Sequence, residues 1–190
     1  MIFSPAYLSS RIIRPLRYMF ENYVDPELRW TSDELTSNIE IDTINNFNKK
    51  AIQAKPRIMI SRGSHIIDKT GLTDSMMASA GSRVDLGLTK ETKMVLINGT
   101  AQLLIQSRFE GTCEKITDYT EHFLVWAAQF LCNSQGFKTF AIPLQVSPCT
   151  PNREDNEIFE VSIGIPWSME ESWKVSDDAL VLKNINFNIN

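Results

Sequence analysis

The chain contains one long segment with helical periodicity, and most of the other patterned segments have the periodicity of strands. This combination restricts the possible fold classes more than any other feature of the sequence. Apolar side chains recur at helical spacing from residue 113 to about residue 134. The stripe consists of Ile116, Thr120, Phe123, Ala127 and Phe130 or Leu131, widened by Leu124 and Ala128. Gly111 and Thr112 introduce the helix, and Gly136 supplies its C-terminal stop. The pattern predicts an amphipathic helix with one buried face.

Three segments before this helix are typical of strands. In residues 39–43, isoleucines alternate with acidic residues, and residues 56–62 place Ile58 and Ile60 on one face. Residues 94–108 form the longest such segment. Within it, Asn98 and Gly99 indicate a bulge or a tight turn.

The strand patterns continue after the helix. Residues 139–147 predict a strand, whereas residues 143–151 contain three prolines and favour a sheet edge followed by a loop. Residues 159–165 alternate cleanly between apolar and polar side chains, which indicates a half-buried strand. We interpret residues 167–173 as a turn or bulge region.

An N-terminal helix is also predicted. Ser4 and Pro5 form a suitable start, and Asp25-Pro26 ends the element. Its apolar stripe comprises Leu8, Ile12, Leu16, Met19 or Phe20, and Tyr23. Because Pro15 lies in the interior, we expect a kink or two short helices.

Together these elements predict an α+β fold with a mostly antiparallel sheet, flanked by an N-terminal helix and one long central helix. Residues 1–190 are expected to form a single domain. Residues 63–93 have weak periodicity and predict an extended loop or arm. Residues 176–190 form a C-terminal extension, and we interpret its end as a final strand or as an arm that adds to another sheet.

The composition is that of a soluble globular domain, with 43% hydrophobic and 22% charged residues. A net charge of −4 argues against bulk attraction to nucleic acid or an anionic membrane. Arginines interrupt the apolar N-terminal stretch, so we expect neither a signal peptide nor a membrane span. The three cysteines include no CxxC pair and are expected to be free thiols in a reducing cytoplasm.

No motif for catalysis or cofactor binding is present. The chain lacks a P-loop, a GxGxxG after a strand, a GxSxG elbow and an HExxH motif, so we expect no enzyme and no cofactor. The best metal candidate is the row Glu114, Asp118 and His122, which share one helix face; a solvated face explains the same spacing more simply. Cys113 at the helix start is the candidate nucleophile of a small hydrolase, although inert packing is the simpler interpretation.

Some residues without a core role are candidates for partner contacts. Arg11, Arg14 and Arg17 would share a helix face, which would be either solvated or used to dock an acidic partner or nucleic-acid backbone. Trp30, Trp167 and Trp173 lie outside the central helix, and we expect Trp167 to be core. In the tail, Ile185, Phe187 and Ile189 alternate with asparagine.

The order of these segments resembles virion proteins of tailed bacteriophages. The resemblance covers most of residues 6–175 and rests on the N-terminal helix and five segments after it. These are PRIMISRG, KMVLINGTAQLLIQSRFEG, CEKITDYTEHFLVWAAQFL, IPLQVSP and FEVSIGIPWSMEESW. The chain is most similar to the small neck proteins that finish the tail or join it to the head, the tail terminator type. Two segments depart from that pattern. The 63–93 segment is longer than expected between those strands, and the asparagine-rich C-terminus is an extension.

The resemblance implies a sheet flanked by helices and a ring, commonly a hexamer, without an active site. Its implied partners are further copies of the chain, the tail tube and the head connector, while DNA passes through the channel without specific binding. The protein would be found in the virion, and in the host cytoplasm during assembly. A head-closure, tube or baseplate component is the structural alternative. A small metal-dependent or cysteine hydrolase and a monomeric adaptor are alternatives of other classes.

Overall fold

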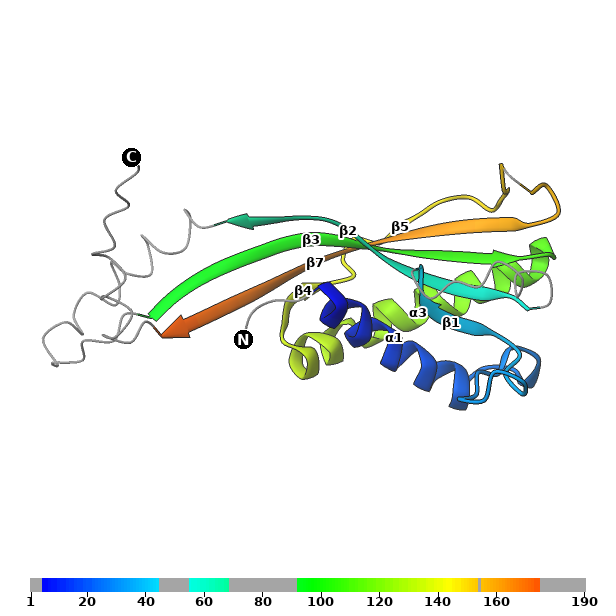
Figure 1. Cartoon of the computed structure of the whole chain (residues 1–190), viewed down its shortest axis with the longest axis horizontal. Coiled ribbons are helices and arrows are strands. Elements are labelled where there is room, and N and C mark those ends of the chain that lie inside the picture. Colours follow the sequence, from blue (N-terminus) through cyan, green and yellow to red (C-terminus); the bar gives the residue numbers. More distant parts are fainter. Residues whose placement is uncertain (1–4, 45–54, 69–91, 154, 175–190) are drawn as a thin grey trace, which may run out of the picture.

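The structure is a computed structural model, and it describes residues 5–44, 55–68, 92–153 and 155–174. Two α-helices and a mixed seven-stranded sheet make up this part of the chain (Figure 1). The predicted α+β class is therefore confirmed.

The elements follow one another in a simple order, with β3 and β7 as the longest strands. They are α1 (Pro5–Asn22), the 3₁₀ turn η1 (Pro26–Leu28), β1 (Glu40–Thr43), β2 (Arg57–Asp68), β3 (Thr92–Ser107), α3 (Glu110–Gln135), β4 (Phe137–Phe140), β5 (Gln145–Val146), β6 (Thr150–Pro151) and β7 (Phe159–Lys174).

The sheet has the order β1-β2-β3-β7-β4. Only β1 and β2 are parallel, and all other described pairs are antiparallel, as the strand patterns predicted. The short strands β5 and β6 also pair with β7. Thus β4, β5 and β6 form one interrupted edge along β7, which agrees with the prolines found there.

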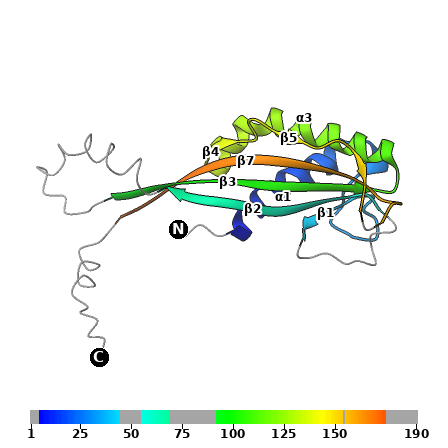
Figure 2. The same ribbon diagram turned by 90° about the horizontal axis from the view of Figure 1, so that it is seen from above.

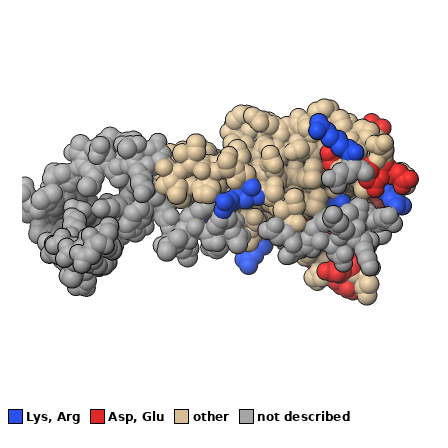
Figure 3. All heavy atoms as spheres, turned by 45° about the horizontal axis from the view of Figure 1, so that its top comes forward, with Lys and Arg blue, Asp and Glu red and all other residues tan. Residues whose placement is uncertain are grey.

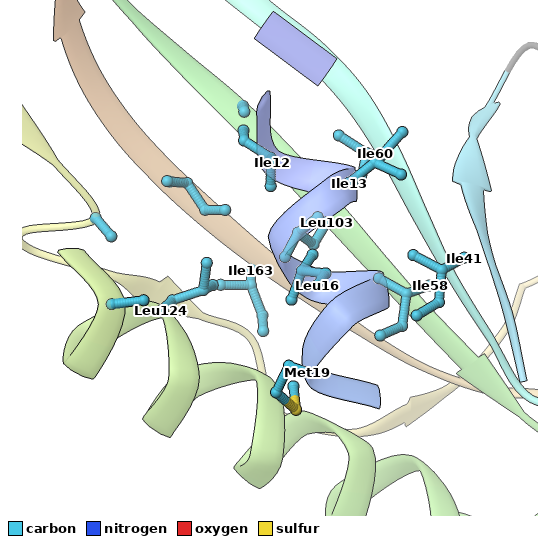
Figure 4. Close-up of a cluster of buried hydrophobic side chains, with 14 of the residues drawn as sticks. Ile12, Ile13, Leu16, Met19, Ile41, Ile58, Ile60, Leu103, Leu124 and Ile163 are labelled. Carbon is cyan, nitrogen blue, oxygen red and sulfur yellow. The ribbon is translucent and has the colours of Figure 1, made fainter. Parts of the chain in front are cut away.

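Both helices pack on the same face of the sheet (Figures 1 and 2). α1 covers β1 and β2, whereas α3 covers β3, β7 and β4. Figure 4 shows Leu16 of α1 and Leu124 of α3 meeting Leu103 and Ile163 of the sheet; all four are fully buried. Alternate residues of the long strands supply the sheet side of this core, as a period of two requires.

The N-terminal helix differs in two details from its prediction. α1 is one helix that passes through Pro15, so the alternative of two short helices is wrong. Both Met19 and Phe20 are buried with the rest of the stripe, but Tyr23 is exposed because α1 ends one residue before it.

The central helix is close to its prediction. It begins at Glu110, three residues earlier than expected, and Gly136 ends it in the left-handed conformation at φ 73°. Of the two alternatives for the last core position, Leu131 is buried and Phe130 is exposed.

Three strand boundaries were predicted wrongly. β2 continues to Asp68 and β3 begins at Thr92, so both ends of the expected 63–93 loop are strand; residues 69–91 lie outside the described part. Residues 167–173 belong to β7 and are paired along their whole length with β3. The expected 139–147 strand is interrupted at Ala141, whose φ is 58°. In the first two cases, pairing with a neighbouring strand overrides weak local propensity.

The bulge expected at Asn98-Gly99 lies on the neighbouring strand instead. β3 keeps continuous register with β7 through both residues, whereas the β2 register shifts between Arg62 and His65, directly opposite. Gly99 has a packing role, because a Cβ there would lie 2.6 Å from the indole ring of Trp167.

The long strands continue beyond the helices as a three-stranded arm (Figure 1). We define the arm as residues 66–68 of β2, 92–98 of β3 and 168–174 of β7; β3 pairs with β7 throughout the arm and with β2 at residues 96–98. Beyond Ile97 and Met169, which still pack on the core, the arm extends the central part of the sheet without a helical layer beside it (Figure 1).

Candidate assembly interface

Large apolar side chains are exposed on the solvent side of α3. Val125, Trp126 and Phe130 are 58%, 81% and 63% exposed, and we call these three residues the α3 face. Helix geometry places them there, because Leu124, Ala127 and Leu131 take the positions that point to the sheet. The α3 face lies beside the core stripe and adds nothing to it.

The second half of α3 lacks charge. No Asp, Glu, Lys or Arg occurs from residue 123 to residue 135, whereas residues 110–121 contain four acidic side chains and one lysine. Depletion of charge together with enrichment of aromatic residues is the composition of the buried centre of a protein–protein interface. The α3 face thus has interface character and is uncovered in the isolated chain.

Trp126 was not among the residues singled out from the sequence. A signal was present, since Val125 and Trp126 fall outside the stripe that contains Ile116 and Leu124, whereas Phe130 was one of its two possible last members. Six apolar residues in succession, from 123 to 128, conceal that signal because every face of the helix contains a hydrophobic residue there. Only the packing of α3 against the sheet decides which of these residues are buried and which remain exposed to solvent.

The arginine row does not form a common surface. Arg17 donates two hydrogen bonds to the Ile41 carbonyl, at 3.0 and 2.7 Å, and lies 5.0 Å from the Trp30 ring centroid. Arg11 lies over the Phe137 ring at 5.9 Å and contacts the Met169 sulfur at 3.7 Å. Arg14 is exposed. Two members of the row therefore have roles within the fold, which leaves Arg14 as the member available to a partner.

The other residues predicted to contact a partner lie in different environments. Trp167 is buried in the core, as expected. Trp30 is partly buried against the core, with Arg17 on its ring. The side chain of Trp173 and the tail residues Ile185, Phe187 and Ile189 lie outside the described part.

A shallow pocket of about 390 Å³ opens beside Trp30 at the β1 edge of the sheet. Ile39, Ile41, Leu35 and the stem of Arg17 contribute to its lining, and Leu35 is almost fully exposed. The pocket and the α3 face lie toward opposite edges of the sheet, because α1 covers β1 while α3 covers β7 and β4.

The helical metal candidate remains a row of surface side chains. Glu114, Asp118 and His122 are all exposed, and the His122 Nδ1 lies 2.7 Å from the backbone oxygen of Asp118. Among the described residues, no three His, Cys, Asp or Glu side chains are grouped so that they could hold a metal ion. Within residues 5–44, 55–68, 92–153 and 155–174, the geometry therefore brings no further ligand to this row.

Cys113 has the opposite electrostatics from those of an activated nucleophile. It is fully buried, and its thiol contacts the backbone oxygens of Ile105 and Phe159 at 3.8 and 3.7 Å. Burial raises the pKa of this thiol to about 12, with the neighbouring Cys149 as a further cause. The thiolate that nucleophilic attack needs is thus strongly disfavoured.

A buried polar row crosses the sheet at the end opposite the arm. Arg57 donates to Gln106 at 3.0 and 2.7 Å, Gln106 donates to Glu160 at 3.1 Å, and Asn152 donates to the same carboxylate at 2.6 Å. Burial lowers the pKa of Arg57 to about 10. These residues hydrogen-bond to one another across neighbouring strands, so the row is explained by the fold.

Comparison with known proteins adds no family to this description. No protein-family model matches the chain, and no curated protein matches it. Among the described residues, no helix is both long and apolar enough to cross a membrane.

Proposed function

We propose that this protein is a virion structural protein that forms a ring at a phage neck, where it terminates the tail, joins it to the head connector, or does both, without catalysis. The observation that carries the proposal is the α3 face, an exposed apolar surface centred on Trp126 in a half-helix without charge. The likeness of the segment order to small phage neck proteins supports the neck position, and the helix-flanked sheet is compatible with it.

The energetics of the α3 face favour association. Burying one large apolar side chain contributes about 1.5–3 kcal/mol, and tryptophan is enriched among the residues that dominate binding energy. The isolated chain leaves this free energy unused at Val125, Trp126 and Phe130. Contact with a second subunit would recover it.

The placement of surfaces suits a ring. The α3 face lies toward the β7 and β4 side, and the pocket beside Trp30 lies at the β1 edge. Contacts between different surfaces of identical subunits are head-to-tail, and such contacts close into rings when the rotation permits. A hexamer is the expected ring, formed in the host cytoplasm and retained in the virion.

The charge distribution is compatible with a DNA channel. The net charge of −4 gives no bulk attraction to phosphate, so DNA could slide through the ring without being held. On the face shown in Figure 3, acidic and basic side chains lie together at the end away from the arm.

Substitution of Trp126 tests the proposal. In sedimentation experiments the wild-type protein should form a concentration-dependent ring, or a monomer that assembles only on purified tails or connectors. We expect Trp126→Glu to weaken that association at least about tenfold, because the charge must be desolvated at the interface. Tyr23→Glu is the matched control, since Tyr23 is also a highly exposed aromatic residue but lies outside the α3 face.

Thermal unfolding of both variants should remain close to that of the wild type, because neither side chain contributes to the core. A wild-type monomer that also fails to bind tails would contradict the ring. Assembly by Trp126→Glu at wild-type concentrations would contradict the role of the α3 face.

Electron micrographs of particles made without the protein would assign its position. Tails of uncontrolled length would indicate a terminator, whereas full heads without tails would indicate a joining or head-closure role. Defects confined to the tube or baseplate would instead place the protein in the structural alternative.

A further inference from the structure

An apolar row crosses the base of the arm and stops at an exposed residue. Phe137, Met169, Ile97 and Ile67 are register partners on four adjacent strands, β4, β7, β3 and β2. Ile97 is buried, but Ile67 at the end of the row is 49% exposed. The row therefore presents an apolar side chain at the edge of the sheet.

Within the described part of the chain, the edge of β2 is unpaired along the same stretch. β1 pairs with β2 only from Arg57 to Ile60, and no described strand pairs with the outer side of residues 61–68. Ile66, on the other face of the strand, is 72% exposed. The bulge after Arg62 bends the edge, but the segment from His65 onward has no charged side chain before Asp68.

An open strand edge with apolar side chains is a template for an added strand. The backbone groups of the edge supply hydrogen bonds, and alternate side chains of the incoming segment supply specificity. A fitting segment needs apolar residues at every second position, so that one face continues the row that ends at Ile67.

The C-terminal segment of the chain has this pattern. Ile185, Phe187 and Ile189 alternate with Asn184, Asn186, Asn188 and Asn190. The described chain ends at Lys174 in the arm, and residues 175–183 could span up to about 30 Å when extended. The length is sufficient for the segment to leave its own subunit.

We propose that residues 184–190 of one copy add as a strand to the 61–68 edge of β2 in a neighbouring copy, with Phe187 and its apolar neighbours beside Ile67. The inference rests on the proposed ring and names a second contact within it. The neighbour's edge is favoured over the subunit's own edge, because β3 lies between β7, which ends at Lys174, and the β2 edge of the same subunit. The contact is head-to-tail, so it would repeat around a ring.

Cross-linking between two distinguishable copies tests this contact. Full-length chains with Cys132→Ser and Cys149→Ser would be co-expressed with two tags, one carrying Ile67→Cys and the other Phe187→Cys. A short bismaleimide should produce a heterodimer that contains both tags. Ile66→Cys provides a second edge position, and Tyr18→Cys, an exposed position on α1, is the control that should give no heterodimer with Phe187→Cys.

Sedimentation of the same samples separates this inference from the proposed function. A heterodimer at the edge positions alone supports the strand contact. An intact ring without this cross-link would contradict the proposed strand contact but would still support the proposed ring. A link found only within single chains, in a doubly substituted protein, would place the tail on its own edge and overturn the contact between copies. A protein that forms no oligomer, alone or on tails, would overturn both.

Discussion

Gly99 illustrates how a single residue adapts the sheet to its core. The Trp167 ring lies directly over it, and a Cβ at this position would be 2.6 Å from a ring carbon and 2.9 Å from the Cβ of His65. Trp167 is itself buried among the helices and strands. The missing side chain therefore provides the space that the tryptophan occupies.

Adding one methyl group at Gly99 should destabilise the fold. We expect Gly99→Ala to lower the free energy of unfolding by about 1–3 kcal/mol, because the extra carbon overpacks the core. Gly111→Ala is the matched control: a Cβ there meets nothing within 4 Å, and it should leave stability unchanged or raise it by up to about 1 kcal/mol. Urea denaturation measures both values, and equal stability of the two variants would show that the ring moves aside without cost.

Cys113 should be the least reactive of the three thiols. Its pKa of about 12 leaves almost no thiolate at pH 8, and the residue is fully buried. Brief alkylation of the native protein followed by mass spectrometry should modify Cys132 and Cys149, which are partly exposed, before Cys113. Urea should make all three react equally. Rapid native modification of Cys113 would contradict the buried environment.

The same thiol should make the fold sensitive to alkali. Because the folded pKa is raised above the ordinary value of 9.0, the thiol contributes its full stabilisation below that pH. This contribution is lost as the pH rises from about 9 toward 12, since the unfolded chain ionises first. Cys113→Ala should therefore lose less stability over that interval than the wild type does.

At the scale of elements, Arg17 ties α1 to the edge of the sheet. Its guanidinium donates twice to the Ile41 carbonyl, lies 3.8 Å from the Asp42 carboxylate and covers the Trp30 ring. One side chain thus joins α1 and β1 to the segment that connects them. Lysine could not reproduce this arrangement, because two nitrogens of the planar guanidinium donate to the same carbonyl oxygen while its face covers the Trp30 ring.

Removal of this side chain should loosen the α1–β1 contact. We expect Arg17→Ala to lower the free energy of unfolding by about 1.5–3 kcal/mol, the range for a hydrogen bond to a charged group. Arg14→Ala, from the same predicted row, should change it by less than about 0.5 kcal/mol because Arg14 is exposed. Thermal or urea unfolding distinguishes the two variants. Equal losses of unfolding free energy in the two variants would contradict the special role of Arg17 within the arginine row.

The elements themselves were largely predictable from local patterns. Both helices, nearly all of β1 and β3, and the first parts of β2 and β7 follow from periodicity that neighbouring residues create on their own. Prediction was wrong at residues 63–68 and 167–173, where the periodicity is weak. There the long β3 strand holds both neighbours in extended register, and no local signal reveals such pairing.

At the scale of the whole molecule, the fold separates three surfaces. The helical layer covers one face of the sheet and presents the α3 face outward, the pocket beside Trp30 lies at the β1 edge, and the arm extends beyond both helices (Figures 1 and 2). A subunit with separate surfaces can contact two neighbours at once. This separation is the physical basis of the ring and strand-addition proposals.

The amino-acid sequence by itself determined the α+β class, the two amphipathic helices and the mostly antiparallel sheet, because each depends on periodicity and on glycine or proline at element ends. Only the tertiary structure decided which apolar residues remain outside the core and exposed to solvent. Phe123, Leu124, Val125 and Trp126 are consecutive and all hydrophobic, and the direction in which α3 faces the sheet buries Leu124 and exposes Trp126. Likewise, the packing of Arg17 against β1 and the burial of Cys113 arise from contacts between distant segments, which local spacing does not encode.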